Sequence, residues 1–149
     1  MDSNHPIIIG AAQLSERDVT LQTATNPIDI LSRIVRETAD SSGGKPRLIE
    51  SIDTIGLAHV FGWTSNNPPR LLSEAIGAKP ATEWQSVVGG ESALALTNNA
   101  AMRIASGESQ LAFLGGCNNI RAIGLARKAG IHLDWPTGGT ASPTSVGEP

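Results

Sequence analysis

The sequence contains a single cysteine, Cys117, which excludes an internal disulfide framework and a cysteine-rich metal site. The histidines are His5, His59 and His132, and none of them is spaced against an acidic partner or a set of metal ligands. We therefore expect no metal centre, and we interpret His59, at the end of an apolar run, as structural. One free thiol suits a reducing compartment, so we expect a cytoplasmic protein.

Basic clusters and long apolar runs are also scarce. The formal net charge is −3, and the densest basic stretch, residues 121–128, is short. A nucleic-acid-binding surface needs a basic face, so this class of function is excluded. The apolar run at residues 6–12 is too short for a signal-peptide core or a membrane span. We expect neither a nucleic-acid partner nor a membrane partner.

The 149 residues are 40% hydrophobic and 17% charged, a composition that suits one globular domain. Apolar runs typical of buried strands alternate with segments of helical periodicity. Strands are expected at residues 6–12, 52–60, 83–88 and 110–114. Helices are expected at residues 27–39, 68–76 and 91–106, with a basic helix that begins at Asn118 or Asn119 and ends before Gly130.

This alternation of strands and helices predicts an α/β fold, with a mostly parallel sheet and helices on both of its faces. The dipeptides Asn26-Pro27 and Asn67-Pro68 combine a capping side chain with a proline suited to the first helical turn. The predicted α/β domain spans residues 1–136. Residues 137–149 show no periodicity, and we expect them to form a flexible tail.

The helix expected at residues 91–106 is apolar on most sides. Only Asn99, Arg103 and Ser106 form a narrow polar stripe. A helix of this kind is usually packed between two layers, so we expect it to be the most buried helix of the protein. Covering it would require a partner, either a second copy of the chain or a complementary subunit.

Two double-glycine turns follow predicted strands, at Gly89-Gly90 and at Gly115-Gly116. Glycine at such a turn lets a ligand approach the backbone, and the start of the next helix favours an anion. Tight packing of a strand against a helix requires glycine for the same steric reason, and both explanations remain open. Neither turn matches a dinucleotide-binding or phosphate-loop pattern, so nucleotide binding has no support.

Three segments around these turns resemble the nucleophile region of thiolases: residues 87–92, 100–107 and 111–116. Residues 62–63 with 67–72, and residues 126–130 with 135–136, resemble an acetyl-CoA acetyltransferase branch of the superfamily, which is similar to the sterol-carrier-protein type of thiolase. The resemblance extends over residues 6–136. It implies a fold of two similar α/β halves, of which this chain would form the first, incomplete half.

The resemblance also implies acyl-CoA handling in lipid metabolism by thiolytic or Claisen-type acyl transfer. Members of the family use a cysteine thiolate as acyl acceptor, and counting back from Gly115 places that position at Gly90. Glycine can carry no acyl group, and the family's other catalytic motifs belong to a second half that this sequence lacks. Family members also pair their third strands, here residues 83–88, across a two-fold axis, which implies a homodimer.

Two other side chains near these turns are candidates for chemistry. Cys117 lies beside an expected helix start, which could lower the pKa of its thiol, but a small inert residue is the alternative. Glu91 is placed to stabilise the positive end of the following helix, with a role as general base as the alternative. The cations of the last helix could bind the phosphates of coenzyme A or only complement the helix dipole; they are Arg121, Arg127 and Lys128.

Three functional hypotheses follow from these observations. The first is a thiolase-like protein without the nucleophile, which binds acyl-CoA or supports a larger assembly. Its ligand would be coenzyme A or acyl-CoA, held near Gly89, Gly90 and Glu91, with no covalently bound cofactor. The second is an acyltransferase or carbon–carbon lyase that is active only in a full-length or complexed form. The third is a non-catalytic interaction module.

Overall fold

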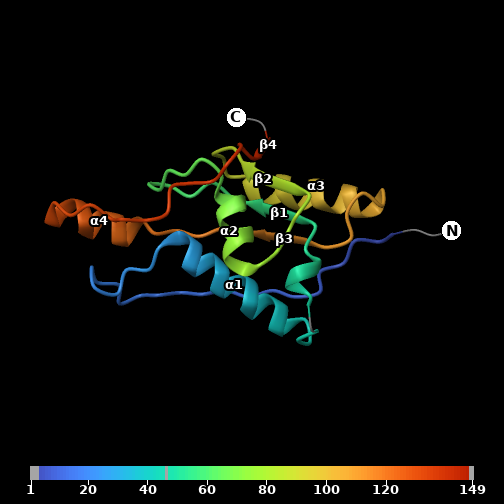
Figure 1. Ribbon diagram of the computed structural model, residues 1–149, viewed down its shortest axis with the longest axis horizontal. Helices are drawn as coiled ribbons and strands as arrows, with labels where there is room; N and C mark the ends of the chain where they lie inside the picture. The colour runs from blue at the N-terminus through green and yellow to red at the C-terminus, as the bar shows by residue number, and fades with distance from the viewer. Residues whose placement is uncertain (1–3, 46, 148–149) are drawn as a thin grey trace.

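The computed structural model describes residues 4–45 and 47–147. Its sheet is fully parallel, with the strand order β3-β1-β2-β4 (Figure 1). The strands are β1 (Thr54–Leu57), β2 (Thr82–Ser86), β3 (Ala112–Gly115) and β4 (Thr144–Val146). The helices are α1 (Pro27–Ser41), α2 (Pro68–Ile76), α3 (Ser92–Ala105) and α4 (Ile120–Ala129), with a short 3-10 turn, η1 (Ile49–Ser51). This architecture confirms the predicted α/β class.

Helices cover both faces of the sheet, as predicted. On one face, α1 and α2 bury an apolar cluster against β1 and β3 that includes Leu31, Ile55 and Leu72. On the other face, α3 packs Leu96 and other side chains against Trp84 of β2. The two clusters are separate because successive side chains of a strand point to opposite faces of the sheet.

The asparagine–proline signals begin helices where the sequence predicts them. The side-chain oxygen of Asn26 accepts a hydrogen bond of 3.0 Å from the amide of Asp29 at the start of α1. Asn67 does the same at the start of α2, accepting a bond of 3.1 Å from the amide of Arg70. Gly77 ends α2 at a φ of 75°, a left-handed conformation that glycine adopts without steric cost.

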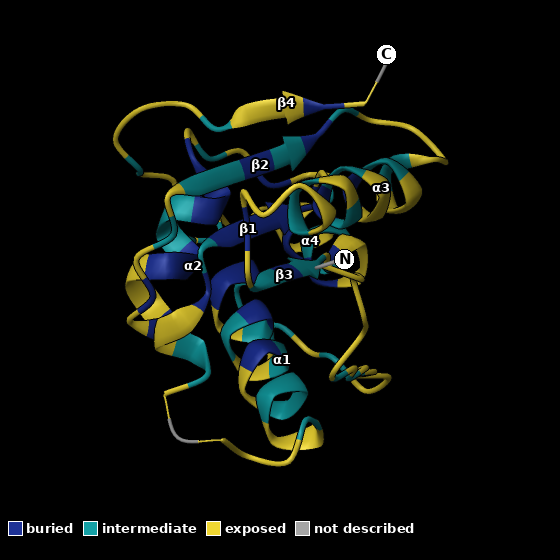
Figure 2. Ribbon diagram, turned by 90° about the vertical axis from the view of Figure 1, so that its right-hand side faces the viewer, coloured by how far each residue is buried: buried dark blue, intermediate teal, exposed yellow. Residues whose placement is uncertain are grey.

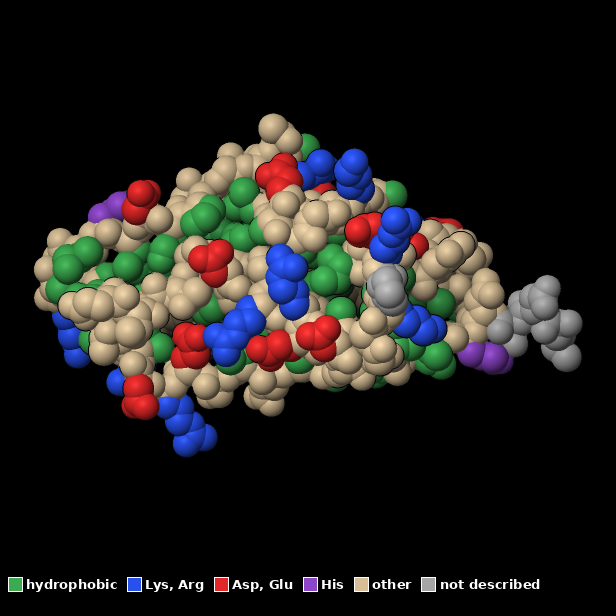
Figure 3. Space-filling model, turned by 60° about the horizontal axis from the view of Figure 1, so that its bottom comes forward, with side chains coloured by type: hydrophobic (Ala, Val, Ile, Leu, Met, Phe, Trp, Pro, Cys, Tyr) green, Lys and Arg blue, Asp and Glu red, His purple; other side chains and the backbone are tan. Residues whose placement is uncertain are grey.

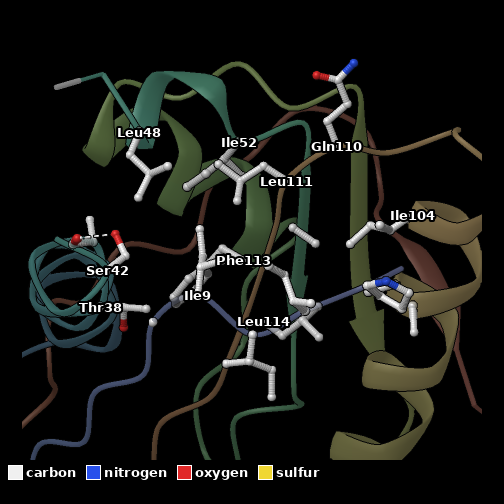
Figure 4. A pocket seen from close by; sticks show the side chains of 18 of the residues that line it. Ile9, Thr38, Ser42, Leu48, Ile52, Ile104, Gln110, Leu111, Phe113 and Leu114 are labelled. Atoms are coloured by element: carbon white, nitrogen blue, oxygen red, sulfur yellow. Dashed lines mark hydrogen bonds between the residues drawn. The ribbon is translucent and has the colours of Figure 1, made fainter. Parts of the chain in front are cut away.

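The strand expected at residues 6–12 does not form. Ile7, Ile8 and Ile9 lie outside the sheet, with exposed fractions of 76%, 85% and 45%. The segment is tied at its far end to α1, where the amide of Ala11 donates a 3.0 Å hydrogen bond to Ser41 Oγ. From there it runs across β3 rather than along it (Figure 4). An apolar run predicts burial but not the strand edge that would have to receive it, and here that prediction is wrong.

Helix α3 is also more exposed than its composition predicts. Only Leu96 and Ala100 are buried, whereas Leu94 and Met102 are 61% and 62% exposed. One side of the helix rests on the sheet, and the opposite side faces solvent (Figure 2). The expectation that this would be the most buried helix is corrected, because an apolar helix becomes buried all round only if a second layer is present to cover it.

The range 137–149, expected as a tail without regular structure, contains strand β4. This strand pairs in parallel with β2, in a register that places Trp84 opposite Thr144 (Figure 2). The amide of Val87 extends the contact with a hydrogen bond of 2.9 Å to the carbonyl of Val146. Because β4 covers β2, the expected pairing of residues 83–88 with a second copy has no open edge in this structure.

Candidate functional site

The carboxyl ends of β1, β2 and β3 lie at one edge of the sheet, where ligands of open parallel sheets commonly bind. His59 follows β1, Gly90 follows β2 and Cys117 follows β3. Gly90 and Cys117 are candidate site residues predicted from the sequence, whereas His59 was expected to be structural. Its imidazole is instead exposed and contacts the Phe61 ring edge-on, with 5.6 Å between ring centroids.

Gly90 lies in the exposed turn between β2 and α3, as the register with thiolases predicts. It is not one of the glycines with positive φ, and a Cβ built on it would meet no atom within 4 Å. The position would therefore accept a cysteine or another side chain without strain. Its neighbour Gly89 is more restricted, because an added Cβ would lie 2.9 Å from the carboxylate of Glu91.

Glu91 occupies the N-cap position of α3, but its side chain makes no capping hydrogen bond. The carboxylate folds back towards Gly89 instead. The Ser92 hydroxyl donates to the carbonyls of Gly89 and Val87, at 2.6 and 2.8 Å, and so does not satisfy the amides of the first turn. The predicted capping role of the Glu91 side chain is therefore wrong. The first-turn amides of α3 are left without a side-chain cap.

The second double-glycine turn is explained by packing. A Cβ on Gly115 would lie 2.8 Å from the ring of Phe113, and a Cβ on Gly116 would lie 3.1 Å from the Cβ of Ala58. Both distances are too short for a relaxed contact. Of the two explanations that the sequence left open, steric need for glycine is the one that applies at this turn.

Cys117 lines a small cavity of about 120 Å³ between the N-terminal segment, α1 and the start of α4. Burial raises the pKa of its thiol to about 11. The thiol is therefore protonated near neutral pH, whereas a nucleophilic cysteine needs the thiolate. This environment favours the inert interpretation of Cys117.

Other charged groups near this edge do not converge on one point. Arg121 is exposed at the start of α4, while Arg127 and Lys128 lie in its last turn, and the helix extends away from the sheet (Figure 1). Figure 3 shows acidic and basic side chains interspersed on one face of the molecule. In the described part of the chain, no group of three or more His, Cys, Asp or Glu side chains could hold a metal ion. Nor is any described helix long and apolar enough to cross a membrane.

The two sequence blocks that resemble the acetyltransferase branch meet in space beside this edge. The indole N–H of Trp63 donates a 2.8 Å hydrogen bond to the carbonyl of Pro136. The Ser65 hydroxyl donates to the carbonyl of Gly138 at 3.0 Å. These contacts hold the loop after β1 against the segment that leads to β4.

At the opposite end of the sheet, Asp53 joins the start of β1 to the start of β3. Its carboxylate accepts hydrogen bonds from Ser109 Oγ at 2.5 Å and from the amide of Gln110 at 2.6 Å. Partial burial acts to raise the pKa of Asp53. The hydrogen bonds from Ser109, Gln110, Thr54 and Leu111 outweigh it, so the pKa is lowered. The ionised carboxylate is therefore the form that the fold stabilises.

We expect Asp53→Asn to lower the free energy of unfolding by about 1–2 kcal/mol at pH 7, because charge-assisted hydrogen bonds are lost. Since the folded-state pKa lies below the unfolded one, the contribution of Asp53 is present above pH of about 4 and is lost as pH falls through the folded-state pKa. Urea unfolding at pH 7 and at pH 3 measures both effects. An equal difference between variant and wild type at the two pH values would contradict this account.

The structure resembles that of a monomeric SCP2-thiolase-like protein, type 1, from Mycobacterium smegmatis, with a TM-score of 0.62 and 25% sequence identity. The match covers 76% of this chain and 24% of that chain, so the chain spans about a quarter of the length of its structural neighbour. No family model and no curated protein matches the sequence. The chain has a thiolase-like fold, as predicted. The neighbour is a monomer, and it gives no support to the expected homodimer.

Proposed function

We propose that this chain binds acyl-CoA without becoming acylated, as a thiolase-like protein that lacks the nucleophile. The observation that carries the proposal is Gly90. It is exposed, has room for a side chain, and precedes the uncapped start of α3, a helix of 14 residues. A thioester carbonyl or a phosphate placed there would accept hydrogen bonds from the first-turn amides and would lie at the positive end of the helix dipole.

The absence of acylation follows from the two candidate positions. Gly90 has no side chain that could accept an acyl group, and the thiol of Cys117 is protonated near neutral pH, since its pKa is raised to about 11. We expect acetyl-CoA to bind with measurable heat in a calorimetric titration. Intact mass after incubation with acetyl-CoA should show no added acetyl group. A stoichiometric adduct on Cys117 would overturn the non-acylating role, and absence of heat would overturn the binding role.

A charge reversal tests where acyl-CoA binds. Gly90→Asp places a carboxylate where the proposal puts the anionic part of the ligand, so we expect affinity to fall at least tenfold. Gly138→Asp is a matched control, because Gly138 is also exposed and a Cβ there would meet no atom within 4 Å. Equal affinities for the two variants would rule out the start of α3 as the binding position.

Gly90→Cys tests the register with the thiolase nucleophile. Because the position is open and its φ is not positive, we expect the free energy of unfolding to change by no more than about 0.5 kcal/mol. The introduced thiol, exposed at a helix start, should react with iodoacetamide much faster at pH 7 than Cys117, which is half-buried and has a raised pKa. Comparing alkylation of the variant and of wild type measures this, and a loss of stability above 2 kcal/mol, or equal alkylation rates, would show that the register is wrong.

A second candidate function is a non-catalytic part of a larger assembly. The exposed apolar residues on the outer side of α3 favour it, since Leu94 and Met102 are both more than half exposed. Contiguous exposed apolar surface commonly marks a protein interface. Calorimetry separates the two candidates, because an assembly part without a ligand site would give no heat with acetyl-CoA. An acyltransferase or lyase that is active only in a full-length or complexed form would also convert substrate once that form is assembled.

A further inference from the structure

A cavity of about 700 Å³ lies beside the outer edge of β3, between α1 and α3 (Figure 4). Its walls include Val35 and Thr38 from α1, Ala101 and Ile104 from α3, and residues 110–114 from the edge of the sheet. None of the side chains that line it is Asp, Glu, Lys or Arg. His5 also lines the cavity, and the rest of the lining is uncharged. The cavity lies between the two helical layers, at the level of the sheet.

The backbone of β3 is open towards this cavity. On its other side, the carbonyls of Leu111 and Gly115 accept hydrogen bonds of 3.0 and 2.8 Å from the amides of Asp53 and Ala58. Backbone groups alternate along a strand, so Ala112 and Leu114 direct their N–H and C=O groups away from β1. Within the described residues, β3 is the last strand on this side of the sheet. An unpaired strand edge of this kind is a template for another strand.

The cavity lies where a further strand of the sheet would lie, and its lining suits such a strand. Successive side chains of a strand point to opposite faces, so a strand placed beside β3 would direct alternate side chains towards α1 and α3. Both walls are largely apolar where they face this space, with Val35 and Ala39 on α1 and Ala101 and Ile104 on α3. A suitable occupant is therefore extended, uncharged and apolar on both faces.

The chain's own apolar segment is held in another position. A Cβ on Gly10 would overlap the carbonyl of Thr38, so the backbone there lies directly against α1. The hydrogen bond from the amide of Ala11 to Ser41 Oγ fixes the same point. Residues 5–9 then cross the opening of the cavity, and Ile7 and Ile8 remain exposed. This segment spans the opening, and no described residue pairs with the outer edge of β3.

We propose that this cavity is an acceptor site for an extended, uncharged apolar strand of a partner polypeptide, which pairs with the outer edge of β3. The unpaired groups of Ala112 and Leu114 recur at the two-residue period that a strand backbone matches. A fatty acid would fill the apolar volume but would leave these groups unpaired, and the lining contains no Lys or Arg to pair with its carboxylate. Binding by strand addition takes its affinity from main-chain hydrogen bonds and its specificity from alternating side chains.

A synthetic peptide tests the proposal: acetyl-Lys-Ser-Val-Ile-Val-Ile-Ser-Lys-amide, whose central residues are apolar on both faces. We expect binding by calorimetry and at least tenfold slower hydrogen exchange of the Ala112 and Leu114 amides. A peptide of the same sequence with alternate amides N-methylated should not bind, because its hydrogen-bonding edge is blocked. Equal binding of the methylated peptide, or no binding at millimolar concentration, would overturn the proposal. The proposal would also be overturned if laurate bound the protein and the peptide did not slow hydrogen exchange of the Ala112 and Leu114 amides.

Two variants locate the site. Ala101→Arg introduces a charge into the α3 wall and should weaken peptide binding at least tenfold. Ala105→Arg is the matched control, because Ala105 is exposed on the same helix and does not line the cavity, so its affinity should match wild type. Equal affinity of both variants would place the peptide elsewhere. These measurements do not involve acetyl-CoA, so their outcome is independent of the proposed acyl-CoA binding.

Discussion

Glu83→Ala is expected to lower the free energy of unfolding by about 2 kcal/mol, because it removes a buried carboxylate that pairs with Arg70, whose side chain is 40% exposed. The Glu83 side chain is only 10% exposed, and its Oε1 lies 2.7 Å from Nε of Arg70. Its Oε2 accepts hydrogen bonds from Nη2 of Arg70 at 3.2 Å and from Nδ2 of Asn67 at 3.0 Å. Removing the carboxylate leaves a buried amide and a partly buried guanidinium without their acceptor.

The consequence should extend beyond β2, because Asn67 also caps α2 and donates to the carbonyl of Thr140 at 3.4 Å. Urea unfolding followed by circular dichroism measures the loss. Glu37→Ala is the matched control, since Glu37 pairs with Arg33 at 3.2 Å but is 43% exposed, and such pairs contribute less than about 1 kcal/mol. Similar losses of unfolding free energy for the two variants would show that burial of Glu83 does not increase the contribution of its ion pair to stability.

Leu31→Ala is expected to cost about 2–5 kcal/mol, the range for truncating a buried leucine. Leu31 is fully buried, at 0% exposure, in the cluster that joins α1 to the sheet. Its loss should open a cavity that the surrounding side chains fill only in part. Leu94→Ala is the control with the same chemical change on the exposed side of α3, where the side chain is 61% exposed. We expect less than about 0.5 kcal/mol there.

Calorimetric or urea-induced unfolding of the two leucine variants decides between two descriptions of α3. If Leu94→Ala costs as much as Leu31→Ala, the outer side of α3 is covered in solution, as its composition alone predicts. If only Leu31→Ala is costly, the exposed side of α3 is free for a partner.

The sequence alone determined those features that depend on neighbouring residues. Asn26 and Asn67 began helices where predicted, because a capping side chain and the following proline act within a single turn. The alternation of apolar runs and helical periodicity determined the parallel α/β class, because a parallel connection requires a crossover. It also placed Gly90 at the turn between β2 and α3.

Only the tertiary structure decided features that depend on contacts between distant segments. The apolar run at residues 6–12 has the composition of a buried strand, yet its attachment to Ser41 places it across β3. Composition alone could not show that residues 144–146 would cover β2, since three residues carry too little periodic signal. The raised pKa of the Cys117 thiol, about 11, likewise comes from burial by segments distant in the sequence. Burial and strand pairing are set by what the rest of the chain places nearby, and no local pattern contains that information.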